Sequence, residues 1–239
     1  MEVQYKVGII GLGKIAFTID RDVALKAMQP SNENIIWSHV GAFSNHPKTK
    51  ITAICDVNND NIDSYKKIYG SIASYNDYIK MIESEELDII SICAPTELHG
   101  VIIKKVIENG YTKAIFCEKP MAFTYGEAEK IVELCKSQKI VFAVNYMRRW
   151  DENYINIKNL VLDKELGTLQ SITAYGQTAL LTNACHLIDI ILFISGEPLW
   201  VCGDIQTDYV REVHGRKDHG GVAFIKFKNQ SYAFLKATS

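Results

Sequence analysis

The stretch "YKVGIIGLGKIAFTI" (residues 5–19) decides the fold. Its first six residues form an apolar run that predicts a buried strand, and its last six have the pattern of a helix. Gly11, Gly13 and Ala16 between them make a G-x-G-x-x-A turn. Such a turn brings the chain backbone close to a pyrophosphate at the start of the helix, and the alanine lets helix and strand pack closely. The stretch predicts a dinucleotide-binding turn, with a merely tight turn as the alternative.

Short apolar runs alternate with helical patterns through the first part of the chain. This alternation predicts a doubly wound parallel sheet covered by helices, a Rossmann domain over residues 1–147. Thr124 followed by Glu127 has the spacing of a helix start. The expected strands are 5–10, 50–55, 72–75, 87–93, 113–117 and 139–144, and the clearest expected helices are 96–109 and 124–138.

The acidic residue that such a domain places on the adenosine ribose should end the second strand. Asp56 in "AICDVNN" has that place, although it lies farther from Gly13 than usual because of a polar insertion at 20–39. A carboxylate there repels a 2′-phosphate, so we expect NAD rather than NADP as the cofactor. The residues expected to bind NAD also include Lys14 and Ile15.

Two further strand ends carry polar groups toward the same edge of the sheet. "CAPTELH" (93–99) ends the fourth strand, so Ala94, Pro95 and Thr96 should line the nicotinamide half of the site. His99 there either faces the cofactor or is a buried structural histidine. "CEKP" (117–120) ends the fifth strand, where a lysine can bind a reacting oxygen, a glutamate can hold the lysine, and a proline, through a cis bond, can fix its backbone. Lys119 is therefore a candidate catalytic and cofactor-contacting residue, with Glu118 beside it.

The pattern changes after about residue 148. A helix at 152–163, a long strand at 167–180, a helix at 183–195 and strands at 199–205, 220–229 and 231–238 are expected. The alternation in "VAFIKFK" and "YAFLKA" predicts an open, mainly antiparallel sheet with one covered face. Residues 148–239 thus form an expected α+β domain for substrate binding and oligomerisation.

Composition excludes several classes of protein. A net charge of −2 with scattered Lys and Arg gives no basic surface for nucleic acid or for an anionic membrane. No apolar run is long enough to span a membrane, and the N-terminus lacks the pattern of a secretion signal. The six cysteines include no C-x-x-C pair, so we expect free thiols in the cytoplasm and no metal site.

These motifs together resemble the Gfo/Idh/MocA family of NAD(P)-dependent oxidoreductases. The resemblance rests on the strand–GxGxxA–helix unit, on "CEKP", on "VNYMRRW" before "GTLQSITAYG", and on "TNACHLID" (182–189). It implies a substrate that is a sugar, a cyclitol or a nucleotide sugar, bound between the two domains, and a role in surface-polysaccharide biosynthesis. It also implies a homo-dimer or homo-tetramer formed through the second sheet. Lys119 and His186 correspond to the family's catalytic residues.

The chain departs from the family in two respects. Thr182 stands where many members have a catalytic aspartate, so proton transfer is expected to fall to His186 or Lys119. The chain is also about a hundred residues shorter than most members, so its second domain is incomplete relative to theirs.

The expected substrate-binding residues follow from these motifs, with Asp189 either orienting the imidazole of His186 or binding substrate. A domain-junction salt bridge is the alternative for the arginines of "NYMRRW", and a purely structural pair is the alternative for His186 and Asp189. A non-catalytic NAD-binding protein, and a lyase or hydrolase that uses NAD transiently, are the alternative functions. The substrate-binding set is Asn145, Arg148, Thr182, Asn183, His186 and Asp189.

Overall fold

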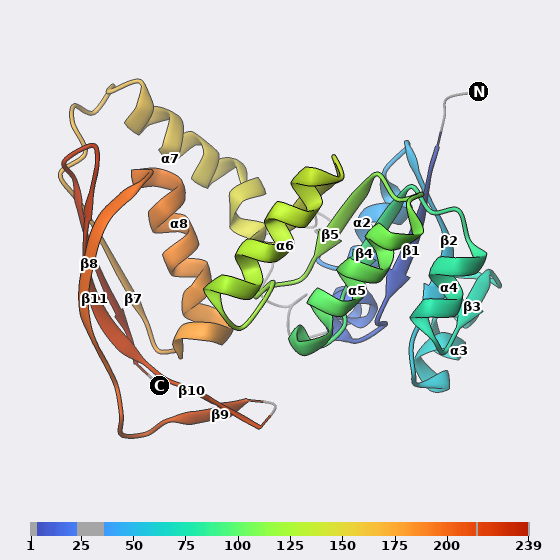
Figure 1. Cartoon of the computed structure of the whole chain (residues 1–239). Coiled ribbons are helices and arrows are strands. Elements are labelled where there is room, and N and C mark those ends of the chain that lie inside the picture. Colours follow the sequence, from blue (N-terminus) through green and yellow to red (C-terminus); the bar gives the residue numbers. More distant parts are fainter. Residues whose placement is uncertain (1–3, 23–35, 214, 239) are drawn as a thin grey trace. The chain divides into compact units, whose positions relative to one another are not determined.

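The computed structural model describes residues 4–22, 36–213 and 215–238 and consists of two compact units (Figure 1). The first unit is Met1–Asn145 and the second is Tyr146–Ser239, so the chain passes from one to the other two residues before the boundary expected from the sequence pattern. Each unit is described by itself below.

The first unit contains a six-stranded parallel sheet in the order β3-β2-β1-β4-β5-β6. The order reverses between β1 and β4, which makes the sheet doubly wound and confirms the expected Rossmann fold. The strands start up to two residues from their expected first residues and end within one of their expected last ones. They are β1 (Tyr5–Ile10), β2 (Thr49–Cys55), β3 (Ala73–Tyr75), β4 (Ile89–Ile92), β5 (Ala114–Cys117) and β6 (Val141–Val144).

Both faces of this sheet are buried, which is why its strands read as continuous apolar runs. Successive side chains of a strand point to opposite faces. In β1, Val7 and Ile9 pack into one hydrophobic cluster with Phe17 and Ile54, whereas Ile10 packs into the other cluster. A single-residue shift in register would exchange the two sets of side chains.

Helices cover the faces, and several of them begin at residues whose side chains cap them. Thr124 accepts a hydrogen bond from the Glu127 N–H, which confirms the expected helix start, and Asn58 and Asp77 cap their helices in the same way. The helices are η1 (Lys14–Thr18), η2 (Ile19–Arg21), α2 (His39–Asn45), α3 (Asn59–Tyr69), α4 (Tyr78–Ser84), α5 (Thr96–Asn109) and α6 (Tyr125–Ser137).

The insertion expected at 20–39 falls largely outside the described residues, but both of its ends are described. Asp20 accepts hydrogen bonds from the backbone N–H groups of Trp37 (2.6 Å) and Ser38 (2.9 Å), and a third from the Ser38 hydroxyl. One carboxylate therefore joins the two ends of the insertion.

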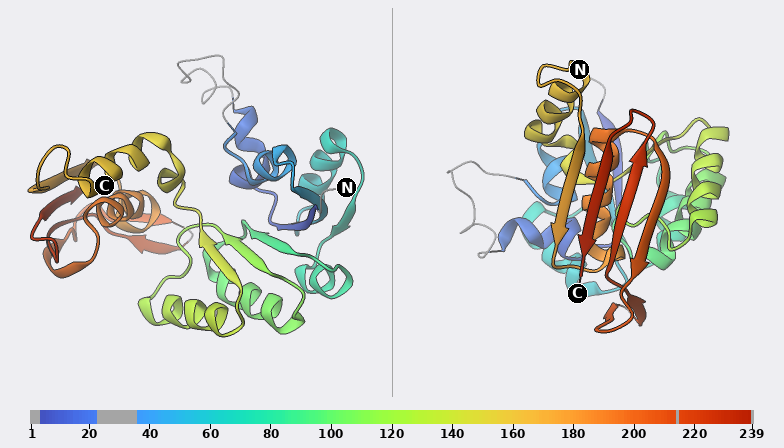
Figure 2. Two further views of the ribbon diagram at one scale, coloured as in Figure 1. Left: turned by 90° about the horizontal axis from the view of Figure 1, so that it is seen from above. Right: turned by 90° about the vertical axis from the view of Figure 1, so that its left-hand side faces the viewer.

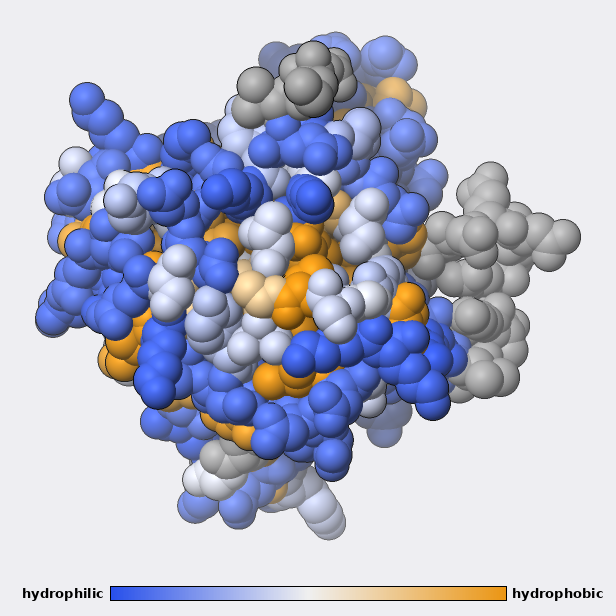
Figure 3. Space-filling model, turned by 90° about the vertical axis from the view of Figure 1, so that its right-hand side faces the viewer, coloured by the Kyte–Doolittle hydropathy of each residue, from blue (hydrophilic) through white to orange (hydrophobic). Residues whose placement is uncertain are grey.

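In Figure 3 hydrophilic residues surround a small hydrophobic area on one face of the molecule.

The second unit is a four-stranded sheet in the order β7-β12-β11-β8 with helices on one face (Figure 2). β12 pairs in parallel with β7, and the other pairs are antiparallel, which confirms a mainly antiparallel sheet. The elements are η3 (Met147–Trp150), α7 (Glu152–Leu162), β7 (Ser171–Gly176), η4 (Leu180–Ala184), α8 (Cys185–Ser195), β8 (Pro198–Ile205), β9 (Arg211–Val213), β10 (Arg216–Asp218), β11 (Gly221–Phe227) and β12 (Tyr232–Ala237).

The long strand expected at 167–180 is wrong in its extent. β7 covers only Ser171–Gly176, because Leu180 already begins the short helix η4, where its N–H bonds to the His219 carbonyl (2.8 Å). The hairpin of β9 and β10 between β8 and β11 was not expected at all.

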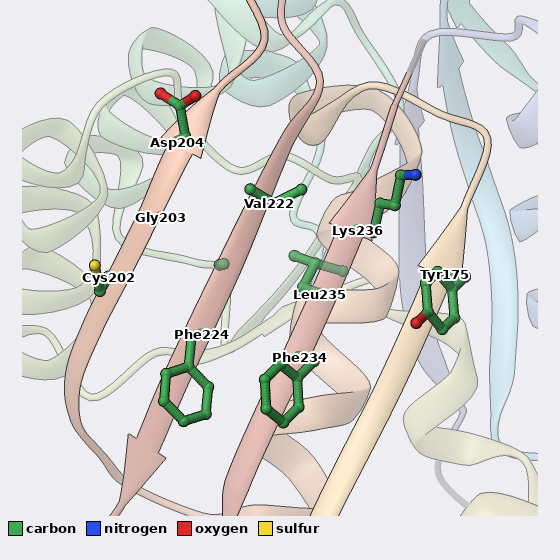
Figure 4. A pocket seen from close by; sticks show the side chains of 10 residues that line it. Tyr175, Cys202, Gly203, Asp204, Val222, Phe224, Phe234, Leu235 and Lys236 are labelled. Carbon is green, nitrogen blue, oxygen red and sulfur yellow. The ribbon is translucent and has the colours of Figure 1, made fainter.

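The two faces of the second sheet differ in cover. Phe227, Ala233 and Leu235 are buried on the helix-covered face together with Ile191 of α8. Aromatic side chains lie on the other face, where Phe224 and Phe234 stack with ring centroids 4.6 Å apart. A surface cavity of about 400 Å³ lies on this face of the sheet. Figure 4 shows Phe224 and Phe234 among the side chains that line it.

Candidate functional site

The glycine turn after β1 has the geometry that the cofactor requires. Gly11 has a φ of +89°, and a Cβ on it would lie 2.8 Å from the Cys93 carbonyl. Gly13 precedes helix η1, has no side-chain cap, and a Cβ built on it meets no atom within 4 Å. Ala16 is fully buried against the sheet. The backbone at Gly13 is therefore open to a pyrophosphate, which fits a dinucleotide.

Asp56 follows the last residue of β2 and contacts the same turn. Its Oδ2 accepts hydrogen bonds from the Leu12 N–H (2.6 Å) and from Asn61 Nδ2 (3.1 Å). Its Oδ1 accepts one from the Asn58 N–H (2.8 Å). A carboxylate oxygen can accept two hydrogen bonds, and among the described residues only Asn58 donates one to Oδ1. Oδ1 can therefore accept a second hydrogen bond from a ribose hydroxyl.

Lys14 and Ile15 are the first residues of η1, directly after Gly13. The Lys14 ammonium forms an ion pair with Asp22 (2.8 Å). This pair links the start of η1 to the residue that follows η2.

The carboxyl end of β4 leads directly into α5. Pro95 is the N-cap residue and Thr96 the first helical residue. His99 is 1% exposed, and its ring nitrogens lie 2.9 Å from the Ala94 carbonyl and 3.0 Å from the Pro120 carbonyl. This geometry fits the structural alternative for His99, since the ring holds two strand-end loops together.

Glu118 is the centre of a buried hydrogen-bond network at the end of β5. Its Oε1 lies 2.9 Å from His39 Nε2 and accepts a hydrogen bond from Asn145 Nδ2 (2.7 Å). Burial alone would raise the pKa of Glu118, but the hydrogen bonds from His39 and Asn145 hold that pKa below its usual value. Asn145, expected at the substrate, is thereby a partner of Glu118.

His39 and Ser91 belong to this network and were not expected from the sequence. His39 Nδ1 lies 2.7 Å from Ser91 Oγ, and both side chains are buried. The signal for His39 was a histidine inside the apolar run "IIWSHVGAF" (35–43), where a buried ring needs polar partners. Nothing in the local sequence identifies Glu118 as that partner.

Lys119 follows Glu118 at the edge of the sheet. Its backbone N–H donates to Glu118 Oε2 (3.2 Å), and the Lys119–Pro120 peptide bond is cis, as expected. Because β1, β4 and β5 are parallel, Gly11, Ala94 and Lys119 all follow carboxyl ends at one edge of the sheet. This is the edge at which ligands bind in doubly wound sheets.

His186 is the second residue of α8 in the second unit. It is largely buried, and its ring packs edge-on against Tyr146, with centroids 5.8 Å apart. Burial, with Cys185 and Asp189 nearby, raises the pKa of Tyr146 to about 12. Asp189 accepts from Arg149 Nε (2.8 and 2.9 Å) and pairs with its Nη2 (2.8 Å), so its hydrogen-bond partner is an arginine of "NYMRRW".

Thr182 contacts a carboxylate that the sequence analysis did not single out. Asp218 of β10 is 2% exposed and accepts hydrogen bonds from the Thr182 hydroxyl (2.6 Å) and from the N–H groups of Thr182 (3.0 Å) and Leu181 (2.8 Å). Asn183 is exposed in η4, and Arg148 is part of η3. The contact between Thr182 and Asp218 spans 36 residues, which is why no local pattern predicted it.

Neither a metal-binding cluster nor a membrane-spanning helix is found among the described residues. They hold no group of three or more His, Cys, Asp or Glu side chains placed to bind a metal ion. Within the same residues, no helix is both long and apolar enough to cross a membrane. The six cysteines, all of which lie in the described ranges, are free thiols.

The fold and the turn define an NAD-binding Rossmann protein. Residues 5–146 match the model of the Gfo/Idh/MocA family, described as an oxidoreductase family with an NAD-binding Rossmann fold. The chain belongs to this family, and its cofactor is NAD.

Curated relatives match over part of their length. The chain is 32% identical over 130 residues to the uncharacterized oxidoreductase YrbE of Bacillus subtilis, a match that covers 54% of this chain and 38% of YrbE. It is 30% identical over 121 residues to inositol 2-dehydrogenase of Salmonella typhimurium, covering 49% and 35%. The matches thus span little more than a third of these relatives.

A solved structure shows the same fold over nearly the whole chain. The WlbA dehydrogenase of Bordetella pertussis, crystallised with NADH and UDP-GlcNAcA, superposes with a TM-score of 0.79 at 18% identity. The superposition covers 98% of this chain and 71% of WlbA. At this identity the likeness supports the fold alone.

Proposed function

We propose that the chain is an NAD-dependent dehydrogenase that oxidises a hydroxyl-bearing carbon of a sugar, a cyclitol or a nucleotide sugar, or reduces the matching ketone. The observation that carries this proposal is the position of Lys119, which follows β5 at the sheet edge where Gly13 leaves the backbone open. A cation at that edge can bind a reacting oxygen. Membership of the family and the named activities of its relatives support the same reaction class.

NAD, when bound, supplies the nicotinamide carbon that takes up or releases the hydride. In our proposal the Lys119 ammonium binds the substrate oxygen and stabilises negative charge that develops on it. The His186 imidazole takes the hydroxyl proton in the oxidation and returns it in the reduction. Arg148, Asn183 and Asp189 are proposed to contact the substrate.

The preference for NAD over NADP is proposed to come from Asp56. Its carboxylate is held against the Leu12 N–H, next to both glycines of the turn. No arginine follows Asp56 closely in the sequence. A 2′-phosphate at this place would therefore meet the negative charge of the carboxylate without a cation to offset it.

Turnover by the purified full chain tests the proposal. NADH absorbance would be followed with NAD and, in separate assays, myo-inositol, scyllo-inositol and UDP-GlcNAcA. We expect turnover with at least one of the three, and Lys119→Ala should lower kcat at least a hundredfold while NAD still binds in a calorimetric titration. Lys104→Ala is the matched control, because Lys104 is an exposed lysine on α5.

A non-catalytic NAD-binding protein is the second candidate. It is favoured by Thr182, whose hydroxyl donates to Asp218, because a threonine cannot act as a carboxylate base. NAD binding without turnover of any sugar or polyol, in both the wild type and Lys119→Ala, would support this candidate and contradict the first.

The open face of the second sheet is proposed to join copies of the chain into a dimer or a tetramer. Its exposed side chains include Phe234, Val222 and Tyr175, and apolar surface of this kind is commonly buried in an interface.

We further propose that the enzyme acts in the cytoplasm in surface-polysaccharide synthesis. Loss of surface polysaccharide on deletion of the gene, restored by the wild type and not by Lys119→Ala, tests that role.

A further inference from the structure

We propose that His39 is a positioning residue for Lys119 and acts on it through the carboxylate of Glu118. The proposal rests on the proposed function for the role of Lys119, and it adds a residue from a distant part of the chain. His39 itself contacts neither the glycine turn nor Lys119 in the hydrogen bonds described above.

His39 is held on three sides. It is 2% exposed, its Nδ1 lies 2.7 Å from Ser91 Oγ on β4, and its Nε2 lies 2.9 Å from Glu118 Oε1. Its ring also packs against Phe116 of β5, tilted by 34° and with centroids 4.9 Å apart. These contacts leave the ring one orientation, with Nε2 directed at the carboxylate.

The carboxylate of Glu118 needs such a donor. A buried carboxylate is costly unless hydrogen bonds compensate for the lost water. His39 and Asn145 both bond to Oε1, whereas Oε2 accepts from the Lys119 N–H. Because the two oxygens belong to one planar group, the bonds to Oε1 restrict the positions that Oε2 can take.

Lys119 is thereby fastened on one side through Glu118. On its other side the Pro120 carbonyl lies 3.0 Å from the ring of a second buried histidine, His99. The partners of the two histidines, Glu118 and Pro120, thus flank Lys119 in sequence, and the loss of His39 removes only the histidine contact on the Glu118 side. The expected result is a Lys119 backbone that stays at the strand end but loses its single orientation.

Two substitutions of His39 separate positioning from simple filling of the core. The amide nitrogen of His39→Gln reaches about as far as Nε2 and can still donate to Glu118, whereas that of His39→Asn reaches only as far as Nδ1 and can bond to Ser91 alone. Both variants remove the ring that packs against Phe116, so a purely structural role predicts the same effect for both.

The backbone amide of Lys119 gives a readout that needs no turnover. In ¹⁵N-labelled full-length protein saturated with NAD, we expect the Lys119 amide resonance to move in His39→Asn and to stay near its wild-type position in His39→Gln. Ile54→Val, a change in the core of β2, controls for a general loss of stability. Equal displacement in both His39 variants, or none in either, would overturn the proposal even if no substrate were ever found.

Turnover gives the second readout. With whichever of the three probe substrates the wild type oxidises, we expect His39→Asn to lower kcat about ten- to a hundredfold, as small displacements of a reacting group do. His39→Gln should recover most of that loss in kcat, and the two variants should have the same thermal midpoint. A loss confined to KM, or equal kcat for both variants, would contradict positioning, whereas absence of wild-type turnover would count against the proposed function alone.

Discussion

At the scale of single residues, the glycine turn combines two separate demands on one position. Gly11 needs a positive φ, and it also needs the absence of a side chain because the Cys93 backbone approaches it. Gly70 at the end of α3 has nearly the same φ, +88°, but a Cβ on it would meet no atom within 4 Å. The two glycines therefore separate conformational strain from close contact.

We expect Gly11→Ala to cost more stability than Gly70→Ala. An alanine at positive φ costs about 1–2 kcal/mol, and only Gly11→Ala adds a clash with backbone atoms. Urea denaturation should show the larger loss for Gly11→Ala, and calorimetric titration should show loss of NAD binding for that variant alone. Equal stabilities would mean that the Cys93 backbone moves aside easily.

Glu118 makes the stability of the first unit depend on pH. Its pKa in the folded protein is lowered, so its contribution to stability is present above its usual pKa of 4.5 and is lost as the pH falls through the folded value. The wild type should therefore exceed Glu118→Gln in free energy of unfolding by most near neutral pH, and the difference should shrink below about pH 4.5.

Urea denaturation at a series of pH values measures this difference. Glu86→Gln, at an exposed position, controls for the loss of one negative charge. A difference that grew toward acid would show that the carboxylate of Glu118 is destabilised by burial instead.

At the scale of elements, Asp218 fastens η4 to the β9–β10 hairpin. Three hydrogen bonds from Leu181 and Thr182 end on this one buried carboxylate. The start of α8, and with it His186, follows η4 directly. The hairpin therefore supports the helix start on which a proposed catalytic histidine lies.

We expect Asp218→Ala to destabilise the chain by about 1–3 kcal/mol, the cost of leaving buried donors without an acceptor. Thr182→Val removes one of the three bonds and should cost less. Amide hydrogen exchange should become faster at residues 180–186 in Asp218→Ala and not in Asp208→Ala, which changes an exposed aspartate. Unchanged exchange would mean that η4 does not depend on the hairpin.

The elements that the sequence predicted well are those whose cause is local. β1 to β6 are buried on both faces, so their apolar runs could be recognised residue by residue, and α6 begins at the capping Thr124 as expected. β7 was expected too long, because the turn into η4 depends on bonds to His219 and Asp218, more than 30 residues away. The place of Asp56 could be read from strand order, whereas the His39–Glu118 contact joins residues 79 apart.

At the scale of the whole molecule, each unit keeps its own buried core, and the second sheet leaves one face open. Phe224 on that face contacts Trp200, Tyr232 and Phe234 through ring pairs on neighbouring strands. β8, the strand at one edge, is exposed along its whole length. Unpaired edges and apolar faces are surfaces on which copies of a chain associate.

We expect Phe234→Glu to shift the purified chain toward the monomer. A charge in the middle of the aromatic face would be buried without a partner in any assembly that covers it. Light scattering coupled to gel filtration measures the mass, and Val141→Glu, at an exposed position of the first unit, is the control. A wild-type chain that is already monomeric at high concentration would contradict association through this face.

The place of β12 in the second sheet has a consequence for synthesis on the ribosome. β7 pairs only with β12 among the described strands, and β12 comes 56 residues after the end of β7 along the chain (Gly176 to Tyr232). β7 therefore leaves the ribosome long before its partner, while the hairpin-forming strands that follow it are still being made. The first unit can fold as it emerges, whereas β7 can pair with β12 only after β12 has been translated, and until then chaperones have an unpaired strand to bind.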